Sequence, residues 1–155
     1  MHRRSFNTFV VAAVTVAAVA PAKLALAQVR VVNVNPQTAL NTLNGIRAQQ
    51  RRAALVSNPT LISLAQEQAT GMAQREQLSH SVVGGFGQRM RGLFAPAAEN
   101  ITVGPTDING AFTQWVNSPP HYANILNQQV TAMGLAGAIS SAGRYYWALI
   151  LGRPR

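Results

Sequence analysis

The sequence predicts an α+β fold in which one sheet lies between two layers of helices, a three-layer α–β–α sandwich. Asn-Pro pairs at residues 35–36 and 58–59 each precede apolar residues at helical spacing, so two long helices are expected early in the chain. Two strand-like runs, 130–139 and 145–151, come later and are joined by a Ser-Ser-Ala-Gly turn. The second run is apolar at nearly every position, which is typical of a strand covered on both faces. Such a sheet requires helices on each side.

Residues 1–27 carry the features of an export signal that is removed from the mature protein. Arg3 and Arg4 form a basic start, residues 9–20 are uncharged and mainly apolar, and Ala-Leu-Ala at 25–27 is a small-x-small cleavage site. We therefore expect a mature chain of one domain, residues 28–155, exported to a periplasm or to the medium and without a transmembrane span. A retained membrane anchor is the alternative, although the apolar run is shorter than the roughly 20 residues that span a bilayer.

The first half of this domain is predicted to hold an edge strand and two long helices. The strand is expected over 29–34, and the first helix runs from 36 to about 52. The second helix runs from 59 to about 76, with apolar residues at regular helical spacing. Glu67 and Glu76 flank that apolar stripe, so we expect both carboxylates to be solvated.

The middle of the domain combines a loop with short elements. Residues 81–87 form a glycine-rich loop whose spacing fits neither phosphate-binding motif. A short helix is predicted over 86–93 and a strand over 98–103.

Two further helices meet at a pair of prolines. Thr106 is expected to cap a helix that carries Asp107 in its first turn, where a negative charge is favourable. This helix must end near Ser118, because two prolines follow. Ser118 is then expected to cap a short helix over 119–126.

Composition narrows the classes of function. The chain has no cysteine, which excludes disulfides, thiolate sites and a lipid-modified N-terminal cysteine. Residues 28–155 hold ten arginines and four carboxylates, a net charge of about +6. Such a charge suits anionic lipids, cell-wall polymers or nucleic acid. Because the arginines are dispersed and no nucleic-acid motif accompanies them, we expect a solvated basic surface and no specific nucleic-acid partner. We also expect the protein to be a monomer.

His80 and His121 are the only imidazoles in residues 28–155, so chemistry that needs an imidazole must use them. His121 is predicted in the first turn of a helix, where the helix dipole favours the neutral ring that binds metal or accepts a proton. His80 follows the second long helix and precedes the glycine-rich loop, a position suited to the rim of a cleft. The structural alternative for His121 is a ring packed at a helix end with one backbone hydrogen bond.

Glu99 is the third candidate, because it enters a strand among apolar neighbours. A carboxylate in such surroundings is costly unless it is paired. With the two histidines it would match a three-ligand zinc set that keeps one position open. The alternative is a structural ion pair with Arg89 or Arg91, and the spacing of the three residues matches no contiguous metal motif.

Several motifs in a fixed order resemble the CAP superfamily of SCP-like extracellular proteins, and the chain looks like the bacterial form. The resemblance extends over about residues 38–152. The main motifs are Leu78-Ser79-His80, Glu99-Asn100-Ile101, Trp115-Val116-Asn117-Ser118-Pro119-Pro120-His121, Met133-Gly134 and Tyr146-Trp147.

The resemblance implies an α–β–α sandwich with a central cleft that carries two histidines and up to two acidic residues. His80, Glu99 and His121 take three of these places. Ser118 stands where animal members carry a further glutamate, which departs from the four-residue pattern. Asn100 is expected to fix the backbone around Glu99, and Arg89 to pair with Glu99.

The resemblance also implies the function that we expect first, a secreted protein whose cleft binds a lipid, sterol or cell-wall component. Zinc or another divalent metal would be held by His80 and His121. The alternative is a metal-assisted hydrolase, a protease or a cell-wall enzyme, in which metal at the histidines activates water and Glu99 is the general base. A third reading is a structural envelope protein whose cleft has no remaining activity.

Overall fold

The computed structural model describes residues 28–155, and the predicted export signal over residues 1–27 lies outside them. The elements in chain order are β1 (Arg30–Val32), α1 (Pro36–Gln49), β2 (Val56–Ser57), α2 (Pro59–Arg75), α3 (Phe86–Met90), β3 (Phe94–Val103), α4 (Ile108–Val116), α5 (Pro119–Ile125), β4 (Ala132–Ile139) and β5 (Tyr145–Pro154).

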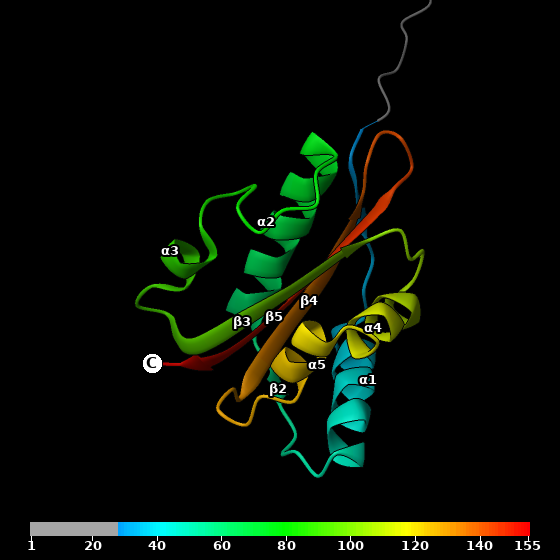
Figure 1. Ribbon diagram of the computed structural model, residues 1–155. Coiled ribbons are helices and arrows are strands. Elements are labelled where there is room, and N and C mark those ends of the chain that lie inside the picture. The colour runs from blue at the N-terminus through cyan, green and yellow to red at the C-terminus, as the bar shows by residue number, and fades with distance from the viewer. Residues whose placement is uncertain (1–27) are drawn as a thin grey trace, which may run out of the picture.

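A five-stranded sheet forms the middle layer, with the strand order β1-β4-β5-β3 and with β2 paired to β4. All pairs are antiparallel except that of β2 with β4. Figure 1 shows α2 and α3 on one side of the sheet and α1, α4 and α5 on the other, in agreement with the two hydrophobic cores. The predicted three-layer α–β–α sandwich is confirmed.

Strand β5 is covered on both faces, as its continuous apolar run predicts. Its alternate residues belong to the two cores: Tyr146, Ala148 and Ile150 to the core under α2, and Trp147, Leu149 and Leu151 to the core under α1, α4 and α5. Because β5 lies between β4 and β3, its residues 146–152 are buried. The two cores therefore meet at this central strand.

Gly134 in β4 allows α2 to lie directly against the sheet. A Cβ at this position would lie 2.1 Å from the carbonyl carbon of Leu61 and 2.2 Å from the amide nitrogen of Ile62. These are backbone atoms of α2, so they cannot move aside as a side chain would. Helix and strand thus pack backbone to backbone at this point.

Both Asn-Pro pairs begin helices in the predicted way. The side chain of Asn35 accepts hydrogen bonds from the amides of Gln37 and Thr38, at 2.9 and 3.3 Å. The side chain of Asn58 accepts one from the amide of Leu61 at 3.1 Å. These contacts satisfy amides that have no partner within the first helical turn.

The cap of α4 differs from the prediction. Asp107, not Thr106, is the capping residue, and its carboxylate accepts a hydrogen bond from the amide of Gly110 at 2.8 Å. Two neighbouring residues that can both cap give the same sequence pattern, so only the backbone path decides between them.

Several predicted boundaries also change. Helix α1 ends at Gln49 rather than near residue 52, because Arg51 takes a positive φ of 53° that no helix continues. Helix α3 ends at Met90 rather than near residue 93. Strand β3 begins at Phe94 rather than at residue 98, because pairing with the end of β5 extends it. The two-residue strand β2 was not predicted, since so short a run has no periodicity.

The expectation that the arginines form a solvated surface is wrong for Arg47, which is fully buried. Its Nε donates to the carbonyl oxygen of Ala53 at 2.8 Å, and its Nη1 donates to those of Ile125 and Asn127 at 2.5 and 2.9 Å. Burial, and to a lesser degree the charge of Arg52, lowers the pKa of Arg47. The guanidinium therefore connects α1 to the C-terminal end of α5.

The two carboxylates predicted to be solvated beside the second long helix are exposed. Glu67 lies in an exposed position on α2, and Glu76 is exposed just beyond its end.

Within residues 28–155, no helix combines the length and the apolar character that crossing a membrane would require.

Candidate functional site

The buried carboxylate of Glu99 lies at the centre of the candidate site. Glu99 is on β3, and its side chain is 1% exposed. One carboxylate oxygen lies 2.9 Å from Nδ1 of His80, and the other accepts a hydrogen bond from Nη2 of Arg89 at 2.7 Å. The predicted pairing with Arg89 is confirmed. Two hydrogen-bonded partners of this kind are what a buried carboxylate requires.

His80 is held from one side and open on the other. It lies in the segment between α2 and α3, and its side chain is 54% exposed. Because an ionised carboxylate can only accept hydrogen bonds, Nδ1 of His80 carries the proton that faces Glu99. The Nε2 atom is then left with a lone pair for a proton, a metal ion or a ligand when the ring is neutral.

His121 lies in the first turn of α5, and its contact with Ser118 was not predicted. Nδ1 of His121 lies 2.9 Å from Oγ of Ser118. Ser118 occupies the N-cap position of α5, as expected, but its side chain makes no capping hydrogen bond. The hydroxyl contacts the imidazole instead, because both side chains lie on the same face of this turn.

Asn100 has a different role from the one that the resemblance implied. Its side-chain amide donates to the carbonyl oxygen of His121 at 2.9 Å, and its oxygen accepts from the side chain of Asn124 at 2.9 Å. Asn100 is fully buried. It therefore fixes α5, and with it His121, against β3, rather than fixing the backbone around Glu99.

The two imidazoles are close enough for their charges to interact. The pKa of His121 is lowered from its ordinary value of 6.5, first by partial burial and then by the charge of His80. A lowered pKa favours the neutral ring at neutral pH, the form that binds a metal ion or accepts a proton.

A groove of about 430 Å³ opens beside His121. Its walls come from the segment after α2, from β3 and from the α4–α5 region, and its apolar part is formed by Leu78, Ile101 and Trp115. Its polar part includes Thr102 and Gln114, whose side chains are hydrogen-bonded to each other, and also Ser118. The groove thus joins an apolar wall to an imidazole.

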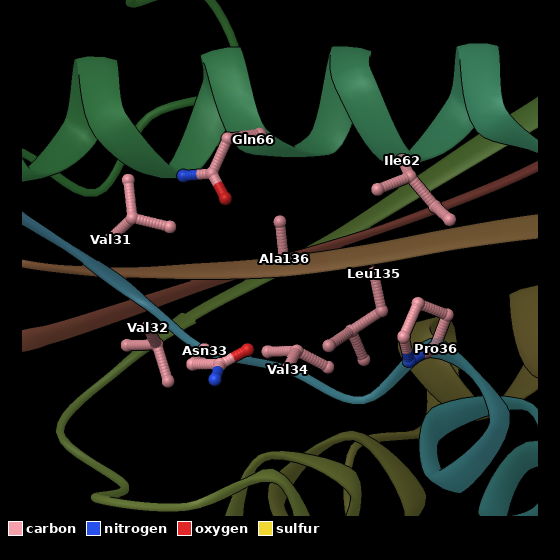
Figure 2. Close-up of a pocket in the computed structure, with 9 residues that line it drawn as sticks. All are labelled: Val31, Val32, Asn33, Val34, Pro36, Ile62, Gln66, Leu135 and Ala136. Atoms are coloured by element: carbon pink, nitrogen blue, oxygen red, sulfur yellow. The ribbon is translucent and has the colours of Figure 1, made fainter.

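A second hollow, which neither histidine lines, has a volume of about 390 Å³. Figure 2 shows Ile62 and Gln66 reaching into it from α2, Leu135 and Ala136 from β4, and residues 31–34 along its other side. No titratable side chain lines it. We therefore place the candidate site at the groove beside His121.

His80, Glu99 and His121 are not grouped as a three-ligand set in this structure. Within residues 28–155, no three His, Cys, Asp or Glu side chains are grouped so that they could hold a metal ion. Both oxygens of Glu99 are engaged by Arg89 and His80. The donor set that remains is the Nε2 atoms of His80 and His121. In this arrangement Glu99 orients the imidazole of His80 through its Nδ1 atom.

Sequence comparison assigns the family. Residues 40–151 match the family described as CAP: Cysteine-rich secretory protein family. The chain belongs to the CAP family. No curated protein matches the sequence.

Solved structures show the same fold as this CAP domain. An outer surface protein from Borrelia burgdorferi is similar with a TM-score of 0.73 and 17% identity, over 81% of this chain and 98% of that one. An extracellular SCP-domain protein from Bacillus anthracis has a TM-score of 0.66 and 25% identity, over 76% of this chain and 39% of that longer one. The venom allergen-like protein 4 of Schistosoma mansoni has a TM-score of 0.59 and 13% identity, over 80% and 91% of the two chains.

The sequence did not predict every residue of the candidate site. Leu78 and Gln114 line the groove, and Asn124 holds Asn100, yet none was singled out for such a role. Leu78 carried a signal, because it is a large apolar residue that follows the end of a predicted amphipathic helix. It is 48% exposed and so is free to contact a ligand.

Proposed function

We propose that this CAP protein is exported, with residues 1–27 removed, and that the groove beside His121 binds an amphipathic lipid, sterol or cell-wall component. The observation that carries the proposal is an apolar wall that lies beside the imidazole of His121. Leu78, Ile101 and Trp115 offer contacts for an apolar group. His121 offers its Nε2 atom to the polar end of such a ligand, and His80 lies near enough for its charge to act on His121.

We further propose that a divalent metal such as zinc is held by the Nε2 atoms of His80 and His121. Both rings are oriented through their Nδ1 atoms, His80 by Glu99 and His121 by Ser118. Two protein ligands leave the remaining positions of zinc to water or to a polar group of the ligand. When bound, the metal would supply a positive charge at the mouth of the groove.

Ligand binding at the apolar wall of the groove is tested by replacing one of two exposed aliphatic residues, Leu78 inside the groove or Val56 outside it. Leu78 lines the groove and is 48% exposed, whereas Val56 lies on β2 and is 63% exposed. Leu78→Asn is expected to weaken binding of a fluorescent fatty acid by about tenfold, because it removes one leucine from the contact. Val56→Asn is the matched control and should leave the affinity unchanged. Equal affinities for the two variants in a fluorescence titration would contradict binding in the groove.

The metal is tested by calorimetric titration of zinc into residues 28–155, beside a His80→Ala/His121→Ala double variant. We expect micromolar or tighter binding by the parent and none by the variant. Binding should weaken at acid pH, because zinc requires the neutral ring. His121 remains neutral to a lower pH than an ordinary histidine, since its pKa lies below 6.5. Equal zinc binding by parent and variant would rule out the histidine pair.

Hydrolysis is the second candidate function, and the pairing of His80 with Glu99 favours it. A carboxylate that accepts the Nδ1 proton orients the ring so that Nε2 can take a proton from water or from a nucleophile. In this conformation both oxygens of Glu99 are engaged, so Glu99 positions His80 while the imidazole accepts the proton.

A further inference from the structure

We propose that the protein has a second binding surface, separate from the groove, which docks on an anionic phospholipid bilayer. This surface is the corner where α3, the start of β3 and the end of β5 meet, and we call it the α3–β5 corner. Its members are Phe86, Met90, Arg91, Leu93, Phe94 and Arg155.

Strand pairing brings these distant segments together. Phe94 of β3 pairs with Pro154 of β5, and the amide of Arg155 donates to the carbonyl oxygen of Leu93 at 3.2 Å. Arg91 directly follows α3. In Figure 1 the C-terminal end and α3 lie on the same side of the molecule. The corner therefore gathers residues from the middle and from the C-terminal part of the domain sequence.

The corner combines an apolar surface with exposed cations. Leu93 is 47% exposed and lies two residues after Arg91 in the sequence. A hollow of about 330 Å³ lies beside it, lined by apolar side chains that include Phe86, Met90 and Phe94. Arg91 and Arg155 line the same hollow.

The positive charge of the corner is not balanced by nearby carboxylates. Among residues 28–155, the only ion pairs formed by arginine or histidine are those of Glu99 with His80 and Arg89. None of the four carboxylate side chains lines the hollow. A carboxylate at the end of Arg155 would offset one of the two arginine charges and leave the corner positive.

An anionic bilayer is the partner that this combination fits. Arginines are attracted by anionic headgroups, and their aliphatic stems can lie along apolar surface while the charge remains in water. An exposed leucine beside them can enter the boundary of the acyl chains, and stable membrane attachment requires an apolar and a basic signal together. Nucleic acid would satisfy the arginines but would leave Leu93 in water. A second copy of the chain would bring like charges together.

The test is co-sedimentation of residues 28–155 with vesicles of phosphatidylcholine alone or mixed with phosphatidylglycerol. This segment is suitable because both hydrophobic cores lie within it. We expect retention only on the mixed vesicles. Arg91→Gln/Arg155→Gln should lower the vesicle affinity by roughly tenfold or more, because each basic residue at an anionic surface contributes about a factor of five.

The matched control is Arg51→Gln/Arg144→Gln, which removes the same charge from two exposed residues outside the corner. It should retain nearly the parent affinity. A loss equal to that of the corner variant would overturn the proposal in favour of general basicity, and so would equal retention on phosphatidylcholine alone.

Leu93→Asn tests insertion separately from charge. It should also weaken retention on the mixed vesicles, whereas full retention by this variant would overturn the proposal. The His80→Ala/His121→Ala variant should bind the vesicles as the parent does, since neither histidine lies in the corner. Loss of vesicle binding in that variant would place the membrane contact at the groove and would overturn the corner.

Discussion

Replacing Arg47 by methionine is expected to lower the free energy of unfolding by about 3–5 kcal/mol. Methionine keeps an unbranched apolar chain in the buried space but leaves the carbonyl oxygens of Ala53, Ile125 and Asn127 without their donors. Each unsatisfied buried carbonyl costs about 1–3 kcal/mol, and relief of the desolvated charge offsets part of this sum. Urea unfolding followed by circular dichroism measures the change.

The control for this variant is Arg75→Met, an exposed arginine at the end of α2, which should change the free energy of unfolding by less than about 0.5 kcal/mol. Ile125 is the last residue of α5, the helix that carries His121. The Arg47 variant should therefore also bind zinc more weakly than the control does. Equal stability of the two variants would show that the buried guanidinium does not hold α1 to α5.

Trp115→Ala is expected to lower the free energy of unfolding by about 3–5 kcal/mol, the usual range for removing a buried aromatic side chain. Trp115 is 1% exposed in the core under α1, α4 and α5. Its ring meets Phe112 edge to face, with 5.5 Å between the ring centroids. Thermal unfolding monitored by near-ultraviolet circular dichroism measures the loss.

Asn109→Ala is the matched control for Trp115→Ala, because Asn109 is an exposed residue of the same helix. It should remain within about 0.5 kcal/mol of the parent. Since Trp115 also lines the groove, its removal should weaken fatty-acid binding as well. A folded Trp115→Ala protein with parental stability would contradict the packing of α4 described above.

The helices could be predicted because their signals are local. The side chains of Asn35 and Asn58 reach amides two or three residues away, so the pattern and the contact lie in the same short segment. Boundaries that depend on partners distant in the chain were missed. Strand β3 gains its first residues by pairing with the end of β5, and β2 exists only because β4 lies beside it.

In the candidate site, too, local features could be predicted and contacts between distant residues could not. Scarcity of imidazole and carboxylate groups made His80, Glu99 and His121 the candidates. The cost of burying a charge predicted an ion pair of Glu99 with Arg89 or Arg91, and the structure shows the pair with Arg89. The contact of Asn100 with α5 joins residues more than twenty positions apart, so no local sequence pattern predicts it. The three candidates are not grouped as a metal site within residues 28–155, and Arg89 and His80 contact the oxygens of Glu99.

The sequence by itself determined the helix starts, the buried central strand, the three-layer class and the short list of chemically able residues. All of these follow from local capping, from periodicity and from composition. Only the tertiary structure decided what Arg47 and Gly134 do. An arginine in a helical pattern looks solvated, and a glycine in a strand looks like a weakness. Burial against three carbonyls makes Arg47 a connection between helices, and contact with the backbone of α2 leaves no room for a side chain at Gly134. Both roles depend on atoms from distant parts of the chain, which meet only when the layers pack.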